Sequence, residues 1–336
     1  MIVFGQGDPG GVFTMAPDGA NQRQIRAASC CARVSPDGRR LVVTSFQGER
    51  PVPATLKPDG SGYNVLQLRD PTLQFNDPWA WSPHGDRIAG EGGEGANGPG
   101  PQAGIYTVSS SGELFQVDAS PGRREFPIAW SPDGSRILFL RQVNRGEDYE
   151  GAMNPFVVNA DGTGLTRLNP PGITSSLIDM PLVTTASWSP NGRRIAFTGS
   201  KEGSWFDSER AVFVVRADGT EPRRITPWSD TFSAMWSPDG RWIAFASLNP
   251  TRTDLFVVHP DGSGTAAVTS SEGDLFSFGP AWSPDSTRIL FVRSPADFDT
   301  TDLWTAKVDG TELVQITHSA AGCNSYSWVT SPQRGS

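Results

Sequence analysis

The chain has 336 residues, with 28 Lys plus Arg against 36 Asp plus Glu, which gives a formal net charge of −8. Binding to phosphate backbones needs a basic surface, so this charge argues against nucleic acid as a partner. No stretch approaches the roughly 18 apolar residues of a transmembrane helix, so we expect no membrane span. The 37 Gly and 28 Pro argue against long helices and for many turns.

In chain order, the N-terminus predicts three short strands, at 2–4, 12–15 and 23–25, and carries no recognisable signal peptide. From residue 34 onward one phrase recurs, Trp-Ser-Pro-Asp-Gly or a close variant of it. It is found at 34–38, 81–85, 130–134, 188–192, 236–240 and 282–286. A spacing of 46 to 58 residues between the serines indicates an internal repeat.

Each repeat reads as strand, Pro-Asp-Gly turn, strand, loop, strand, Asp-Gly turn, strand. Proline fixes φ for the second position of a turn, and glycine supplies the positive φ that follows. Aromatic and β-branched residues fill the runs between the turns, as strands prefer. Four antiparallel strands in such a repeat are typical of one β-propeller blade.

Six repeats are complete, and the three N-terminal strands lack a first strand. Residues 325–328, Ser-Tyr-Ser-Trp, supply it from the other end of the chain. The sequence therefore predicts an all-β fold, a seven-bladed β-propeller of four-stranded antiparallel blades. Residues 1–336 form its single domain, and both termini close the last blade, which removes open sheet edges.

The repeated Trp-Ser-Pro-Asp-Gly phrases, each followed by an apolar run such as Arg-Ile-Ala-Phe at 194–197, resemble the WD-repeat-like blades of TolB-type bacterial propellers. The resemblance implies a rigid, non-catalytic protein-binding scaffold in the periplasm or outside the cell. Relatives also cap serine peptidases, but no Gly-x-Ser-x-Gly nucleophile elbow is present here, so we do not expect peptidase activity.

The short turns between first and second strands and between third and fourth strands lie on one side of such a fold, here called the turn face. The opposite side, the loop face, receives the long connections. These are 46–53, 70–78, 90–103, 119–127, 141–153, 169–186, 199–210 and 269–280. They carry about twice as many acids as bases, so we expect an electronegative loop face around a central channel and a basic protein partner. We also expect a monomer.

Several loop-face residues are candidates for binding. Three tryptophans outside the repeated phrase could anchor a partner or pack against neighbouring loops: Trp79, Trp205 and Trp228. Five acids lie near the entrances of first strands: Asp77, Glu125, Asp179, Asp230 and Asp274. The same residues leave an alternative open, a carbohydrate-binding or carbohydrate-active propeller, either glycosidase or lyase, that uses two acids.

Three carboxylates crowd into six residues at Asp297, Asp299 and Asp302, a pattern that suits calcium. The run lacks the glycine and the terminal glutamate of a calcium loop, so a capped turn is the alternative, and no other cofactor is expected. The histidines His84, His259 and His318 are too dispersed in the repeat for a zinc site.

Cys30 and Cys31 precede the first strand of one blade, and Cys323 precedes that of its neighbour across the closure. These similar positions make a disulfide from Cys323 to Cys30 or Cys31 geometrically reasonable. Free thiols in a reducing compartment are the alternative.

Overall fold

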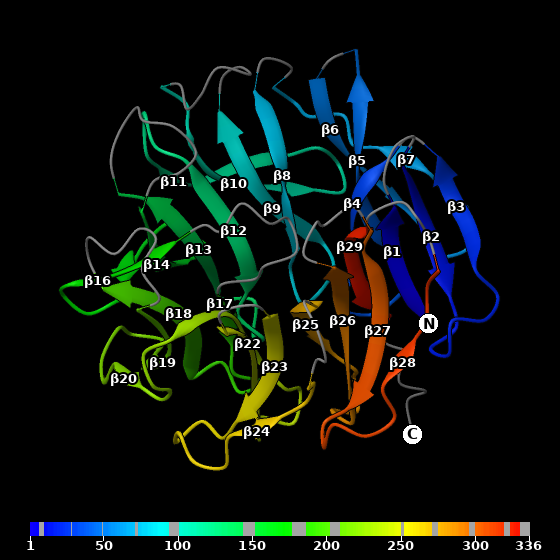
Figure 1. Ribbon diagram of the computed structural model, residues 1–336. Helices are drawn as coiled ribbons and strands as arrows, with labels where there is room; N and C mark the ends of the chain where they lie inside the picture. The colour runs from blue at the N-terminus through cyan, green and yellow to red at the C-terminus, as the bar shows by residue number, and fades with distance from the viewer. Residues whose placement is uncertain are drawn as a thin grey trace, which may run out of the picture.

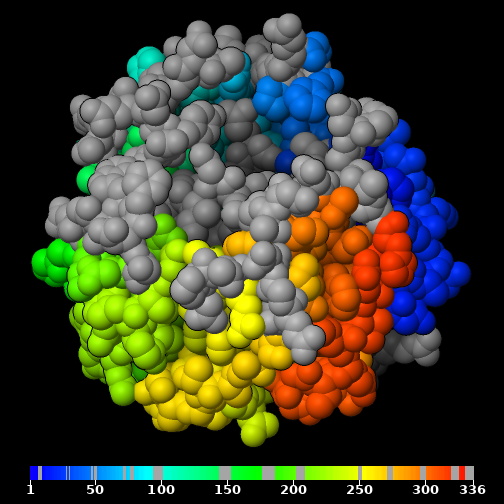
Figure 2. All heavy atoms as spheres, in the orientation of Figure 1, coloured from blue at the N-terminus to red at the C-terminus, as the bar shows by residue number. Residues whose placement is uncertain are grey.

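The computed structural model describes most of the chain, and the described residues form strands and turns. They are 1–6, 10–27, 29–48, 50–70, 73–93, 101–143, 152–176, 186–201, 209–249, 252–270, 275–295, 300–318 and 323–329. The sheets follow one another in chain order around a common centre (Figure 1). In the same view, the blue N-terminal segments lie against the orange and red segments near the other end (Figure 2).

Three sheets have four strands each. The first contains both ends of the described chain, in the order β29 (Cys323–Trp328), β1 (Ile2–Gln6), β2 (Gly11–Met15) and β3 (Arg23–Ala27). The second contains β4 (Cys30–Val34), β5 (Leu41–Gln47), β6 (Arg50–Leu56) and β7 (Asn64–Val65). The third contains β8 (Gln74–Trp81), β9 (Arg87–Gly93), β10 (Gly104–Ser109) and β11 (Leu114–Ala119).

Two larger sheets complete the described fold. One has nine strands: β12 (Glu125–Trp130), β13 (Arg136–Gln142), β14 (Ala152–Asn159), β15 (Thr166–Arg167), β16 (Ile173–Ser176), β17 (Ala186–Trp188), β18 (Arg194–Lys201), β19 (Arg210–Arg216) and β20 (Arg223–Arg224). The other has eight: β21 (Asp230–Trp236), β22 (Ile243–Asn249), β23 (Arg252–Val258), β24 (Ala266–Ala267), β25 (Leu275–Trp282), β26 (Arg288–Pro295), β27 (Asp302–Lys307) and β28 (Val314–Gln315).

The strands from the two chain ends pair along most of their length, with one register shift between Gly5 and Gln6. β29 pairs antiparallel with β1, and Trp328 lies opposite Ile2 at one end of the ladder. The neighbouring pairs are also antiparallel, except for a single parallel contact between β23 and β25 inside the eight-stranded sheet. The all-β prediction is therefore confirmed.

The hydrophobic core lies between successive sheets. One cluster joins Ala89 and Ile105 of the β8–β11 sheet to Ile137 and Phe139 of the next sheet. Stacked phenylalanines link second and third strands, for example Phe139 and Phe156, whose ring centroids are 5.8 Å apart. Apolar side chains on both faces of each sheet are thus removed from water, and this burial drives the packing of the sheets.

The repeated phrase folds into a turn with its own hydrogen-bond network. The Ser131 hydroxyl donates to Asp133 Oδ1 at 2.5 Å and accepts from the backbone N–H of Arg136 at 2.9 Å. Gly134 has a φ of 72°, a conformation that a β-carbon disfavours. These hydrogen bonds lie within the motif itself, so the local sequence favours this turn.

The second motif departs from this pattern. His84 occupies the position of the usual aspartate, and the Ser82 hydroxyl donates instead to Asp86 Oδ1 at 2.6 Å. Asp86 thus takes over the role of the missing aspartate, and His84 is exposed.

The indole N–H groups of the motif tryptophans connect the sheet units. Five of them donate to a backbone carbonyl of the previous unit. In each case the acceptor belongs to the residue immediately before the first residue of that unit's motif. The pairs are Trp81 with Arg33 (3.1 Å), Trp130 with Ala80 (3.0 Å), Trp188 with Ala129 (3.3 Å), Trp282 with Met235 (3.0 Å) and Trp328 with Ala281 (3.1 Å).

Trp236 is the exception, since its indole nitrogen has no hydrogen-bond partner among the described residues. The side chain of Ser187 lies at this junction: its hydroxyl donates to the Ala234 carbonyl and accepts from the Trp236 backbone N–H, both at 2.9 Å.

Candidate functional site

The two described acids at the entrances of first strands, Glu125 and Asp230, are each held by an arginine. Glu125 begins β12, and its carboxylate accepts a hydrogen bond from Arg141 at the end of the neighbouring strand β13. The same guanidinium also pairs with Asp118, near the end of β11. One arginine therefore joins two acids from two sheets at the loop face.

Glu125 is fully buried, with 0% of its surface exposed. Burial raises the pKa of this carboxyl to about 7, against the opposing effect of Arg141 and with a further rise from Asp118. Its Oε2 atom has no hydrogen-bond partner in the described part of the chain. Glu125 is thus a buried acid whose protonation is sensitive to pH.

A second ion pair lies beside it. Glu91 of β9 pairs with Arg124 at 3.1 Å and accepts the backbone N–H of Glu125 at 3.2 Å. Sequence reasoning missed these arginines, because nothing in the local sequence shows which strand ends meet across two sheets.

Asp230 and Trp228 lie together at another strand entrance. Asp230, the first residue of β21, accepts a hydrogen bond from Arg210 at 2.7 Å. The half-buried ring of Trp228 packs edge-on against Phe213, and the guanidinium of Arg224 lies 4.8 Å from its centroid. Both candidates therefore line the loop side of the nine-stranded and eight-stranded sheets.

Trp79 lies in the core. It is 2% exposed, its ring contacts Phe75 at a centroid distance of 5.0 Å, and its indole nitrogen donates to the Thr44 hydroxyl at 3.2 Å. The other loop-face candidates fall outside the description. Asp77 belongs to β8 but its side chain is not described, and Asp179, Trp205 and Asp274 lie in undescribed segments.

The proposed calcium run is described in part. Asp297 and Asp299 lie outside the described residues. Asp302 accepts hydrogen bonds from the Gln315 amide and the Thr317 hydroxyl, both at 2.9 Å. Within the described ranges, no group of three His, Cys, Asp or Glu side chains is placed to hold a metal ion.

The cysteine prediction stays open. Cys323 lies in β29 opposite Gln6, and Cys30 lies in β4 opposite Thr44, but the side chains of both cysteines are outside the description.

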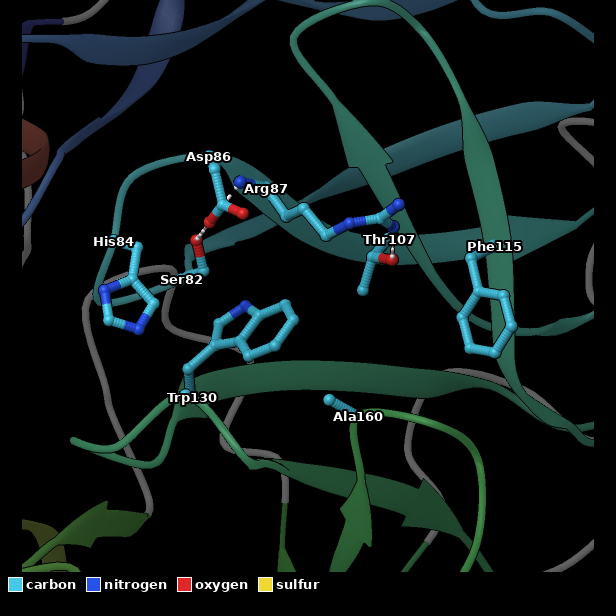
Figure 3. Close-up of a pocket in the computed structure, with 9 residues that line it drawn as sticks. Ser82, His84, Asp86, Arg87, Thr107, Phe115, Trp130 and Ala160 are labelled. Atoms are coloured by element: carbon cyan, nitrogen blue, oxygen red, sulfur yellow. Dashed lines mark hydrogen bonds between the residues drawn. The ribbon is translucent and has the colours of Figure 1, made fainter.

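A cavity of about 350 Å³ opens on the turn face between the β8–β11 sheet and β12 (Figure 3). In this view the Trp130 indole lies between His84 and Phe115. Arg87 donates to the Thr107 hydroxyl at 2.7 Å, which occupies part of its guanidinium. The exposed His84 ring has no hydrogen-bond partner among the described residues, so it is one of the polar groups at this cavity that are available to a ligand, with the exposed Asp86 beside it.

These observations describe an all-β fold of packed, mostly antiparallel sheets in which a repeated motif forms the turns. A sequence model of the TolB beta propeller domain family matches residues 55–332. The chain belongs to this family. The resemblance inferred from the repeated phrases is thereby confirmed.

Solved structures share the TolB-type fold at low sequence identity. Oligogalacturonate lyase from Vibrio parahaemolyticus is 14% identical, with a TM-score of 0.66, covering 89% of this chain and 83% of that one. The propeller domain of the Trilobed protease from Pyrococcus furiosus is 14% identical, with a TM-score of 0.62, covering 94% and 93%. TolB from Acinetobacter baumannii is 16% identical, with a TM-score of 0.52, covering 81% and 64%.

At 14–16% identity, these similarities show that the chain and these proteins share a fold. In the described ranges, no helix has the length and apolar character needed to cross a membrane.

Proposed function

We propose that this chain is a seven-bladed propeller acting as a non-catalytic scaffold that binds a protein partner at its loop face. Three four-stranded sheets count as one blade each. The nine-stranded and eight-stranded sheets each divide into two units at the β14–β16 and β23–β25 junctions. The indole hydrogen bonds support this division, because Trp188 and Trp282 each reach back across one of these junctions.

The pairing of the two chain ends supports closure of the ring. β29 supplies the first strand of the sheet that β1 to β3 continue, and it also contacts β4 of the following sheet. A ring closed in this way holds its blades rigidly, which favours a role as a platform for loops.

The ion pairs at the strand entrances carry the functional proposal. Glu125, Glu91 and Asp230 are each held by an arginine directly beneath the loop face. Glu91 and Asp230 are occupied in this way, and Glu125 through one of its two carboxylate oxygens. We infer that these acids hold the strand ends beneath the loops and do not form an acid pair for bond cleavage. The connections that the sequence assigns to the loop face contain further acids, Asp179 and Asp274 among them, and this charge favours a basic partner.

The remaining parts of the proposal rest on the family. A periplasmic or secreted location, a protein partner and a monomeric state are expected for a TolB-type propeller of this kind. They stay predictions.

Binding of a basic peptide tests the proposal. Isothermal titration with a hexalysine peptide is expected to show saturable binding that weakens with salt. An Asp179→Asn/Asp274→Asn variant should lose most of this binding and keep the wild-type melting temperature. A matched variant on the turn face, Asp59→Asn/Asp261→Asn, should bind hexalysine as the wild type does. Equal binding by the loop variant and the wild type would contradict the proposal.

A carbohydrate-active propeller is the second candidate function. The similarity to oligogalacturonate lyase over most of both chains favours it. Trp228 is half-buried at the loop side, and a sugar ring could stack on it if it displaced Arg224 or Lys201, which lie 4.8 and 5.1 Å from the ring centroid.

Incubation with polygalacturonate, with and without divalent cations, tests this candidate by the ultraviolet absorbance of unsaturated uronides. An increase that depends on Trp228, measured with Trp228→Ala, would favour the enzyme over the scaffold. No increase, together with hexalysine binding, would favour the scaffold.

A further inference from the structure

An arginine in the motif turn connects neighbouring units on the turn face. Arg136, two residues after the motif glycine, donates to the carbonyl of Gly192 in the next motif at 3.2 Å, and its guanidinium lies 5.1 Å from the centroid of the Trp188 ring. Arg40 makes the same hydrogen bond to Gly85. At these two junctions the arginine therefore bonds directly to the next motif turn.

Arg194 occupies the same position in its own motif, but its side chain forms no described hydrogen bond with the next motif turn. Its guanidinium, like that of the adjacent Arg193, has no partner among the described residues, and both side chains are exposed. A cavity of about 870 Å³ lies at this junction, and both arginines line it together with Gly240 and Trp236. Gly240 and Trp236 are the counterparts of the glycine and tryptophan that Arg136 contacts, so the cavity occupies the place of the missing contact. We call it the arginine groove.

Two further arginines line the groove, so its charge differs from that of the whole protein. Arg136 approaches from the preceding unit, where carbonyl groups occupy its guanidinium. Arg216 forms an exposed ion pair with Glu221 at 2.8 Å. The groove is therefore a basic site on an acidic chain, with two guanidiniums available.

The two acids that line the groove are occupied within their own turns. Asp133 accepts hydrogen bonds from Ser131 and Ser135, and these hold its pKa at about 2, with the Ser131 hydroxyl the largest cause. Asp218 accepts the backbone N–H and the hydroxyl of Thr220, at 2.9 and 2.6 Å. Both carboxylates are ionised, but neither forms a described ion pair with Arg193 or Arg194, and the four lining arginines outnumber the two acids.

We propose that the arginine groove binds an acidic peptide segment of a partner protein through its carboxylates. A guanidinium presents paired N–H donors that match a carboxylate, and two adjacent guanidiniums suit an extended ligand with more than one carboxylate. Trp236 is the one aromatic residue among those that line the groove, and it is only 9% exposed. A sugar or a nucleobase would have little ring surface to stack on, which favours a peptide. The groove lies on the turn face, so this inference is independent of the loop-face proposal.

Fluorescence anisotropy with a fluorescein-labelled hexaglutamate peptide tests the assignment, with labelled hexaglutamine as the uncharged control. The groove variant is Arg193→Gln/Arg194→Gln. The matched control is Arg39→Gln/Lys57→Gln, which removes two exposed cations from motif turns of the β4–β7 sheet on the same face. Because all four side chains are exposed, every variant should keep the wild-type melting temperature, and the single variant Arg194→Gln replaces the double variant if it does not.

We expect saturable binding of hexaglutamate to the wild type, weaker at higher salt, and none of hexaglutamine. Loss of the two guanidiniums should raise the Kd about tenfold or more. The control variant should change it by less than about twofold. An unchanged Kd in the groove variant, an equal loss in the control, or no binding by the wild type would each overturn the proposal. Stronger displacement by trigalacturonate or inorganic phosphate than by unlabelled hexaglutamate would overturn the assignment to a peptide.

Discussion

The indole nitrogen of Trp130 donates a hydrogen bond to the backbone carbonyl of Ala80, 3.0 Å away, across the boundary between two sheets. Trp236 holds the same place in its own motif, yet its indole nitrogen has no partner among the described residues. Both residues are 9% exposed, so the two positions are similarly buried and can be compared for this hydrogen bond.

This pair measures what an inter-sheet indole hydrogen bond contributes to stability. Trp130→Phe and Trp236→Phe lose similar ring volume, but only the first removes a donor from a buried carbonyl. We expect Trp130→Phe to lower the free energy of unfolding by about 1–2 kcal/mol more than Trp236→Phe does. Urea unfolding followed by circular dichroism measures the difference. Equal losses in the two variants would show that the hydrogen bond adds no net stability.

The replacement of the motif aspartate by Asp86 as the acceptor of Ser82 leads to a second prediction. Asp86→Ala removes the acceptor of the Ser82 hydroxyl, and we expect it to lower the free energy of unfolding by about 1 kcal/mol. His84→Ala should change it by less than about 0.5 kcal/mol, because that ring is exposed.

A pH series extends this test. The hydrogen bond from Ser82, the largest cause, lowers the pKa of Asp86 below its ordinary value of 3.8. The ionised carboxylate therefore stabilises the fold above that value, and the difference between wild type and Asp86→Ala should shrink as the pH falls below it. A larger loss of unfolding free energy in His84→Ala than in Asp86→Ala would contradict the assignment of Asp86 as the structural acceptor of Ser82.

Glu125 leads to a prediction about pH in the opposite direction. Burial raises its pKa from 4.5 to about 7 in the folded protein. Between these values the unfolded chain has released this proton and the folded chain still holds it, so stability should fall as pH rises from 4.5 to 7. Glu125→Gln removes this titration, and its free energy of unfolding should fall less over the same range.

Chemical unfolding at several pH values measures the effect. Glu113→Gln, at an exposed glutamate, is the control and should keep the wild-type pH dependence. If Glu125→Gln followed the wild-type curve between pH 4.5 and 7, the buried carboxyl would not be the titrating group.

The all-β fold could be predicted from the sequence because its main determinant is local. The turn that contains Ser131 and Asp133 forms its hydrogen bonds within six residues, so a repeated phrase reports a repeated structure. Side chains that act across sheets are not visible in this way. Trp79 looked like a loop residue, and only the structure shows that it meets Thr44 in the core.

The arginine groove shows the same limit. Gly-Arg-Arg occurs at 38–40 and again at 192–194. In the first copy Arg40 crosses to the next turn, whereas in the second Arg194 does not. Identical local sequences thus give different surfaces, because the difference lies in the neighbouring unit. The one motif tryptophan whose indole nitrogen has no hydrogen-bond partner among the described residues, Trp236, lies at this same junction.

The disulfide between Cys323 and Cys30 or Cys31 is the last prediction. β29, which contains Cys323, pairs with β1 and contacts β4, which contains Cys30 and Cys31, so the backbone brings the two segments into neighbouring sheets. Such a bridge would enclose nearly the whole chain, and in the loop-entropy model it stabilises the fold by about 4–5 kcal/mol.

Peptide mass mapping after alkylation without reductant should therefore reveal a Cys323 peptide joined to the peptide of Cys30 and Cys31. Reductant should lower the melting temperature of the wild type to that of Cys323→Ser and leave the variant unchanged. If all three thiols alkylate without reductant, the bridge does not form, and the pairing of β29 with β1 holds the two ends of the chain without covalent help.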